Sequence, residues 1–110
     1  MNDPGFILGV RFWVAPEAKT RMMEWLQGGH VGEVVSQPGF LWGRMLDLKQ
    51  TDDKGWEAYS MIYGVASRAA IDAFNADTAL AARFAEERRR FAGMLRIEVF
   101  MGDVVFGTDK

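Results

Sequence analysis

The feature of this sequence that most restricts its fold is the order in which β-type and helical patterns follow one another. In residues 6–14, FILGVRFWV, every even-numbered position is apolar. Alternation at a period of two is typical of a strand with one buried face. Segments 40–49, 56–65 and 94–101 are also rich in β-branched, aromatic and other apolar side chains. We therefore predict four strands.

A helical stretch connects the first two of these strands. Pro16 suits the first turn of a helix, and apolar side chains then recur at helical spacing. We expect this helix to run from about 16 to 27 and to break at Gly28-Gly29. A second, short helical segment is expected to start near His30 and to end at Pro38-Gly39.

The second half of the chain repeats the order of strand, helix and strand. Residues 51–55, TDDKG, form a turn that joins the second and third strands as an antiparallel hairpin. Ser67 is a good N-cap for a helix that ends near Asn75. A further helix is expected over 78–91, and the stem of Arg88 belongs to its apolar stripe.

The resulting order is strand, helix, strand, strand, helix, strand. Right-handed crossovers place both helical regions on one face of a four-stranded antiparallel sheet, which is an α+β plait of the split βαβ type. A chain of 110 residues suits one domain. We therefore predict a single domain over 1–110, in which residues 104–110 can form a C-terminal arm.

The face of this sheet away from the helices is predicted to be largely apolar. Depending on the register, it carries Trp13 and Ile7 together with Phe40, Trp42, Leu46 and Leu48, or with the neighbours of these four. A monomer rarely exposes an apolar face of that size. A second copy, packed face to face by two-fold symmetry, would cover it. The sequence therefore predicts a homodimer.

Several motifs along the chain resemble the dimeric α/β-barrel superfamily. They are Trp25-Leu26, HVGEV at 30–34, PGF at 38–40, Tyr59 and Tyr63, and SRAAI at 67–71. The chain is most similar to small bacterial proteins near the EthD-like and antibiotic-biosynthesis-monooxygenase-type families, over residues 6 to about 103. The resemblance implies a ferredoxin-like fold and a dimeric α/β barrel. Because the superfamily includes monooxygenases, isomerases, cyclases and haem-active proteins, the resemblance implies no single reaction.

His30 is the one histidine in the chain and the first candidate for catalysis. Its position after Gly28-Gly29, between two predicted helical segments, can direct the imidazole into a cleft. A neutral imidazole can accept or deliver a proton. Glu33, three residues further on, would share a helix face with His30 and could orient the ring. The resemblance implies that this histidine borders a cavity between sheet and helices, whereas the alternative is a structural role as a helix cap or in one hydrogen bond.

Five strand residues are candidates for substrate binding. Arg11 and Arg44 lie among apolar neighbours, where a guanidinium must be paired or solvated. Each could bind a carboxylate or enolate oxygen in the cavity, or could pair with a local acid instead. Trp13 and Trp42 could line an aromatic pocket, and the Tyr59 hydroxyl could donate to an oxyanion. The alternative for these three aromatic rings is ordinary core packing.

Composition excludes several kinds of site and partner. Lys plus Arg is 13 and Asp plus Glu is 15, and a chain with this slight negative charge gains little from binding nucleic acid. Zero cysteines exclude thiolate zinc sites and iron–sulfur clusters, and one histidine excludes a histidine-rich metal site. No apolar run approaches the roughly 20 residues of a membrane-spanning helix. We therefore expect a cytoplasmic protein without a membrane partner.

These observations lead to one main hypothesis about function and to two alternatives. The main hypothesis is a homodimer that binds a small hydrophobic molecule, aromatic or polyketide-like, and acts on it as a cofactor-free isomerase or cyclase. His30 would transfer the proton, and Arg11 or Arg44 would stabilise an oxyanion. The first alternative is a binding or accessory protein without turnover. The second is a monooxygenase or a haem-handling protein, the latter with His30 as the axial ligand of the haem.

Overall fold

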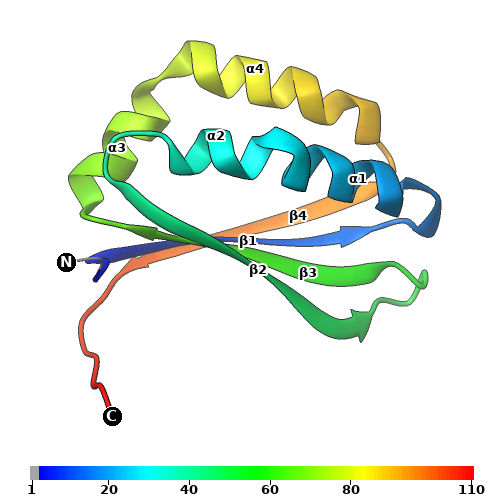
Figure 1. The fold of residues 1–110 in the computed structure, drawn as a ribbon. Coiled ribbons are helices and arrows are strands. Elements are labelled where there is room, and N and C mark those ends of the chain that lie inside the picture. The colour runs from blue at the N-terminus through cyan, green and yellow to red at the C-terminus, as the bar shows by residue number, and fades with distance from the viewer. Residues whose placement is uncertain (1–2) are drawn as a thin grey trace.

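The computed structural model describes residues 3–110. Four strands form one antiparallel sheet in the order β2-β3-β1-β4, and the helices lie on one face of it (Figure 1). The strands are β1 (Phe6–Val14), β2 (Phe40–Thr51), β3 (Glu57–Val65) and β4 (Leu95–Asp103). The helices are α1 (Lys19–Trp25), α2 (Val31–Val35), α3 (Arg68–Ala76) and α4 (Thr78–Arg88). The predicted ferredoxin-like α+β plait is confirmed.

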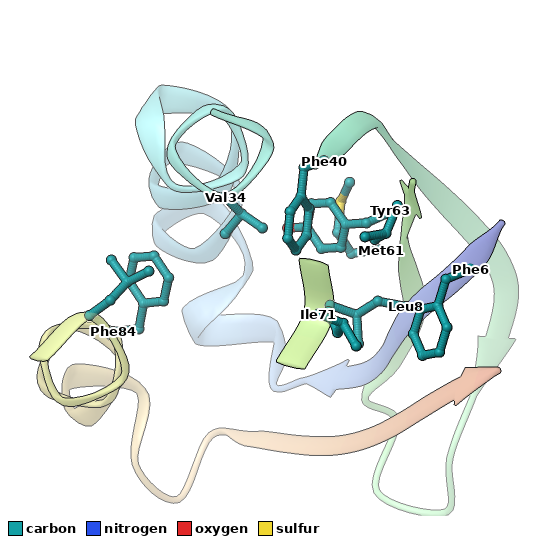
Figure 2. Packing of buried hydrophobic residues seen from close by; sticks show 10 residues of the cluster. Phe6, Leu8, Val34, Phe40, Met61, Tyr63, Ile71 and Phe84 are labelled. Atoms are coloured by element: carbon teal, nitrogen blue, oxygen red, sulfur yellow. The ribbon is translucent and has the colours of Figure 1, made fainter. Parts of the chain in front are cut away.

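The core lies between the helices and the two central strands. The residues of these strands that face the helices are Phe6, Leu8, Val10, Phe12 and Val14 on β1 and Tyr59, Met61, Tyr63 and Val65 on β3. All of them except Val10 are buried, as the period-two pattern of β1 predicts for that strand. Figure 2 shows that Phe84, on α4, lies apart from the group around Met61 and Tyr63.

The register of β2 against β3 decides which side chains lie on the face of the sheet opposite the helices, here called the uncovered face. The sequence alone does not determine this register. Trp42 lies opposite Gly64 and Arg44 lies opposite Ile62, so both side chains point away from the helices. A register shift separates Trp42 from Phe40, which is buried in the core. Phe40 therefore does not belong to the uncovered face.

The helical stretch between β1 and β2 runs through the two glycines at which we predicted a break. A 3-10 turn over Pro16–Ala18 leads into α1, and a π-helical turn over Leu26–His30 joins α1 to α2. The break is present only as a kink at Gly29, whose φ of 165° and ψ of −33° are not helical. Leu26 and Val34, on either side of this kink, both pack into the core, and their burial holds the two segments on the sheet.

No element of residues 3–110 covers the face of the sheet opposite the helices (Figure 1). Two aromatic rings lie over glycines on this face. A Cβ added at Gly64 would overlap with the Trp42 indole, and one at Gly9 would overlap with the Phe100 ring. Leu46 and Phe100 are 46% and 49% exposed. Large apolar side chains are thus exposed on this face, as we predicted.

The chain leaves the sheet after Asp103. Residues 104–110 form no helix or strand, and Val105 and Phe106 are 92% and 82% exposed. In Figure 1 this segment leads away from the sheet on the side opposite the helices. Its role as an arm stays a prediction. None of the described helices is both long and apolar enough to cross a bilayer.

Candidate functional site

A cavity of about 200 Å³ lies between the sheet and the helices. Residues of β1, β3 and β4 form its floor, and residues of α1, the π-helical turn and α4 form its walls. The lining is mostly apolar and consists of Val10, Phe12, Met22, Trp25, Leu26, Met61, Leu95, Ile97 and Val99. Three further lining residues, His30, Tyr63 and Arg88, have polar side chains.

The cavity is present because the helices do not close over β4, which is an edge strand. Val10 in the middle of β1 is only half-buried, although Leu8 and Phe12 on either side of it are buried. Ile97 and Val99 on β4 face the helix side and are 39% and 56% exposed. The cavity is therefore accessible along β4, which gives a ligand a route to the interior.

The kinked helix places His30 at this cavity. His30 ends the π-helical turn, and such turns occur frequently at functional sites. Its imidazole stacks on Trp25, with ring centroids 4.1 Å apart, and meets Phe84 edge to face at 4.6 Å. Its Nδ1 atom is buried and has no hydrogen-bond partner among residues 3–110. Because buried polar atoms nearly always have partners, this atom is a candidate for contact with a ligand.

Two polar groups of the cavity are neutral at about pH 7. Burial lowers the pKa of His30 below its usual value of 6.5, because apolar surroundings disfavour the charged imidazolium. The negative charge of Glu87 opposes this shift, and the positive charge of Arg88 adds to it. Burial also raises the pKa of Tyr63 to about 12. The imidazole can therefore accept a proton, and the phenol can donate a hydrogen bond.

Glu33 binds a partner other than the one we predicted. Both of its carboxylate oxygens accept hydrogen bonds from Arg83 on α4, and the distance from Arg83 Nη1 to Oε1 is 2.9 Å. This pairing lowers the pKa of the Glu33 carboxyl. Within residues 3–110, no hydrogen bond joins Glu33 to His30. The rings of Trp25 and Phe84, rather than a carboxylate, hold the imidazole in place.

The structure separates four of the predicted substrate-binding residues from the cavity. Arg11, Trp13, Trp42 and Arg44 lie on the opposite face of the sheet. The guanidinium of Arg11 lies 5.7 Å from the centroid of Trp13, and that of Arg44 lies 5.4 Å from the centroid of Trp42. The reason is the alternation of strands: since Phe12 faces the cavity, Arg11 and Trp13 must face away. A ligand role for these four would need a site on the uncovered face.

Tyr59 lies on the helix side of the sheet but does not line the cavity. Its buried ring stacks on Phe12, with centroids 5.6 Å apart. Its hydroxyl donates to Oε1 of Glu57 at 2.9 Å, and Lys19 Nζ donates to the same oxygen at 3.0 Å. Tyr59 is therefore packed as the core-packing alternative describes, and its hydroxyl already has a partner.

Three residues of the site were missing from our predicted set. Trp25 supplies the surface on which His30 stacks, and its Nε1 donates to Oε1 of Glu87 at 2.9 Å. Tyr63 and Arg88 are the other lining residues with polar side chains. The available signal for Arg88 was its position at the end of the apolar stripe of α4, where a charged head is unusual. Among residues 3–110, no group of three His, Asp or Glu side chains is placed to hold a metal ion.

Solved structures of other proteins share this fold. A dimeric ferredoxin-like protein from an uncultured marine organism has a TM-score of 0.69 at 13% identity, over 96% of this chain and 99% of its own. A Streptomyces coelicolor monooxygenase in complex with nanaomycin D has a TM-score of 0.59 at 18% identity, over 96% and 94%. The haem degrader MhuD of Mycobacterium tuberculosis, with two haems in its active site, has a TM-score of 0.57 at 20% identity, over 94% and 99%.

The predicted resemblance to dimeric ferredoxin-like and antibiotic-biosynthesis-monooxygenase-type proteins is confirmed by these likenesses at the level of the fold. No curated protein matches the chain. A family model described as a domain of unknown function (DUF4286) matches residues 6–96, from the start of β1 into β4. The match spans most of the chain, and the protein belongs to the DUF4286 family.

Proposed function

We propose that this protein binds a small, flat, largely apolar molecule in the cavity and that His30 exchanges a proton with it. The observation that carries the proposal is that His30 lines the cavity and that its buried Nδ1 atom has no partner among the described residues. An unsatisfied buried polar atom costs about 1–3 kcal/mol. A ligand that hydrogen-bonds to this imidazole would recover that free energy.

The size and lining of the cavity favour a ligand of one or two fused rings. An apolar cavity of about 150 Å³ is known to bind benzene. The present cavity is about 200 Å³ and is accessible along β4. Phe12 and Trp25 offer aromatic surfaces to a flat ligand. Met22 and Met61 can adapt to its outline, because a thioether side chain is unbranched and flexible.

A neutral imidazole in apolar surroundings suits proton transfer at carbon. His30 would take a proton from a carbon next to a carbonyl group, which leaves an enolate on the ligand and an imidazolium on the protein. Return of the proton to a different atom of the ligand gives an isomer, with no change in oxidation state. The Tyr63 hydroxyl would donate to the enolate oxygen. It takes the role that we predicted for Arg11 and Arg44, which lie across the sheet.

Two proteins of the same fold support small-molecule binding by this chain. The Streptomyces coelicolor protein holds nanaomycin D, and MhuD holds two haems. Small-molecule binding is the general property that we extend to the present chain. The alternative of a binding or accessory protein without turnover differs from the proposal only in the chemistry at His30.

We also propose that the protein forms a homodimer through the uncovered faces of two sheets. Trp13, Trp42, Leu46 and Phe100 lie on this face. The similar marine protein is described as dimeric. Because the cavity lies on the other side of the sheet, each subunit of such a dimer would keep a complete cavity of its own.

The test uses 2-tetralone, a bicyclic ketone with exchangeable hydrogens next to its carbonyl group. In deuterated water, NMR follows deuterium uptake at these positions, and shifts of the single histidine's imidazole signals report binding. We expect wild-type protein to accelerate exchange about a hundredfold over His30→Gln, as a positioned general base does. Two tyrosine variants provide a matched pair: Tyr63→Phe should slow exchange, whereas Tyr59→Phe should not, because Tyr59 does not line the cavity.

The outcomes separate the proposal from its alternative. Binding of 2-tetralone with equal exchange rates in wild-type and His30→Gln protein would assign the chain to the non-catalytic binding proteins. Unchanged imidazole signals at saturating 2-tetralone would contradict the proposal as a whole.

A further inference from the structure

Arg88 gives the cavity a positive charge. It is the last residue of α4, it is half-buried, and among residues 3–110 it is the one Lys, Arg, Asp or Glu that lines the cavity. The carboxylates of Glu33 and Glu87, whose charges act on His30, do not line the cavity. The lining therefore combines apolar walls with one uncompensated cation.

The neighbouring arginines of this helical end all have partners. The pairs are Arg83 with Glu33 and Glu87, Arg89 with Glu86, and Arg90 with the rings of Trp25 and Phe91. The guanidinium of Arg88, by contrast, makes no hydrogen bond, ion pair or cation–π contact within residues 3–110. A half-buried guanidinium must be paired or solvated, so Arg88 is free to pair with a ligand.

We propose that the cavity takes a ring compound that carries a carboxylate, and that Arg88 pairs with this carboxylate. The inference rests on the proposed function, since it requires the cavity to be a binding site. Guanidinium groups bind carboxylates through two parallel hydrogen bonds, which fix direction as well as affinity. The apolar lining strengthens the pair, because charges attract more strongly where water is partly excluded.

The positions of Arg88 and His30 give such a ligand a defined orientation. Arg88 enters the cavity from α4, and His30 enters from the π-helical turn. The two are close enough for the charge of Arg88 to act on the imidazole. A carboxylate held at Arg88 directs the ring into the apolar lining, where Phe12 and Trp25 lie, and brings a fixed part of the ring system to His30.

The test compares two probes of the same shape that differ in charge, 2-naphthoate and 2-naphthamide. Their dissociation constants are measured by calorimetry, and NMR of the His30 imidazole shows that each occupies the cavity. We expect wild-type protein to bind 2-naphthoate about tenfold or more tightly than 2-naphthamide, as a charge-assisted hydrogen bond implies. Arg88→Met should remove this preference, because it should weaken binding of 2-naphthoate far more than binding of 2-naphthamide, and Arg88→Lys should retain part of it.

Arg89→Met is the matched control, because Arg89 is exposed, has Glu86 as its one ion-pair partner within residues 3–110 and does not line the cavity. It should keep the full preference for 2-naphthoate. Equal affinity of wild-type protein for the two probes, or a preference that survives in Arg88→Met, would overturn the inference and leave the proposed cavity intact. If neither probe shifts the His30 signals, the proposed function fails and the inference fails with it. Binding of 2-naphthamide by Arg88→Met also shows that the variant is folded.

Discussion

The imidazole of His30 is half-buried and neutral, and folding stability should therefore depend on its titration. The pKa of His30 in the folded protein lies below the usual 6.5, so in the interval below 6.5 the unfolded chain binds a proton that the folded protein does not. The stability that the neutral imidazole contributes to the folded protein is therefore fully present above about pH 6.5. It is lost as the pH falls toward the pKa of His30 in the folded protein. We expect the Tm of wild-type protein to drop more than that of His30→Gln between about pH 7 and pH 5.5.

Circular dichroism melts of the two proteins across this interval measure the effect. The chain has one histidine, so the difference between the two curves isolates a single imidazole. The paired carboxyls of Glu33 and Glu57, whose pKa values lie below their usual range, lose their charge at lower pH and do so in both proteins. Parallel curves for the two proteins would show that His30 titrates in the folded state as it does in the unfolded chain.

The sequence identifies His30 as a candidate residue better than it identifies the side chains around the imidazole. His30 follows two glycines between helical segments, and a neutral proton acceptor at a helix irregularity is recognisable without coordinates. From the sequence, Arg88 could be recognised only as a residue whose aliphatic stem belongs to the apolar stripe of its helix. Whether its head meets solvent, an acid or a cavity depends on β4, which is distant in sequence. Glu33 satisfied the spacing rule for contact with His30, but Arg83 of a different helix competes for it.

The helix α4 is attached to the rest of the fold by few interactions. Leu80 and Phe84 are its buried residues, and its polar side is held to α2 by the pair of Arg83 with Glu33. We expect Glu33→Gln to speed hydrogen exchange of α4 amides while leaving β1 amides unchanged, because the connection between two elements is lost. The cost in global stability should be small, since both side chains are substantially exposed and solvent screens their attraction.

Glu86→Gln is the control for this prediction. Glu86 pairs with Arg89 three residues on and so connects no second element. Exchange measured by mass spectrometry should therefore be unchanged at α4 in Glu86→Gln. Equally fast hydrogen exchange of the α4 amides in both variants would contradict the prediction. It would mean that the charge on α4, rather than the attachment of α4 to α2, controls local unfolding of this helix.

The elements themselves were largely predictable, since local patterns determine them. The predicted strand 6–14 coincides with β1, and the predicted helix 78–91 corresponds to α4 and the 3-10 turn that follows it. The π-helical turn was not predictable. Glycine pairs usually end helices, and here the burial of residues on both sides, not local preference, carries the chain through the kink.

In the whole molecule, the feature that the sequence could not predict was the register between neighbouring strands. Periodicity shows that a strand has two faces, but a shift of one residue exchanges them. The sequence therefore indicated an apolar uncovered face without deciding whether Arg44 and Trp42 belonged to it or to the cavity. The pairing of β2 with β3 places both on the uncovered face, which separates them from His30. The same pairing strengthens the expectation of a dimer, because it adds Trp42 to that face.

A single charge on the uncovered face should prevent dimer formation. Leu46 lies there and is 46% exposed in the single chain. In a face-to-face dimer, a glutamate at this position would be buried, and removing its charge from water costs more free energy than pairing with Arg11 or Arg44 on the same face would return. We expect Leu46→Glu to be a folded monomer by light scattering and wild-type protein to be a dimer. Ala82→Glu, which adds the same charge on the exposed side of α4, should stay dimeric. A monomeric wild-type protein would contradict the proposed dimer, and a dimeric Leu46→Glu variant would place the interface elsewhere.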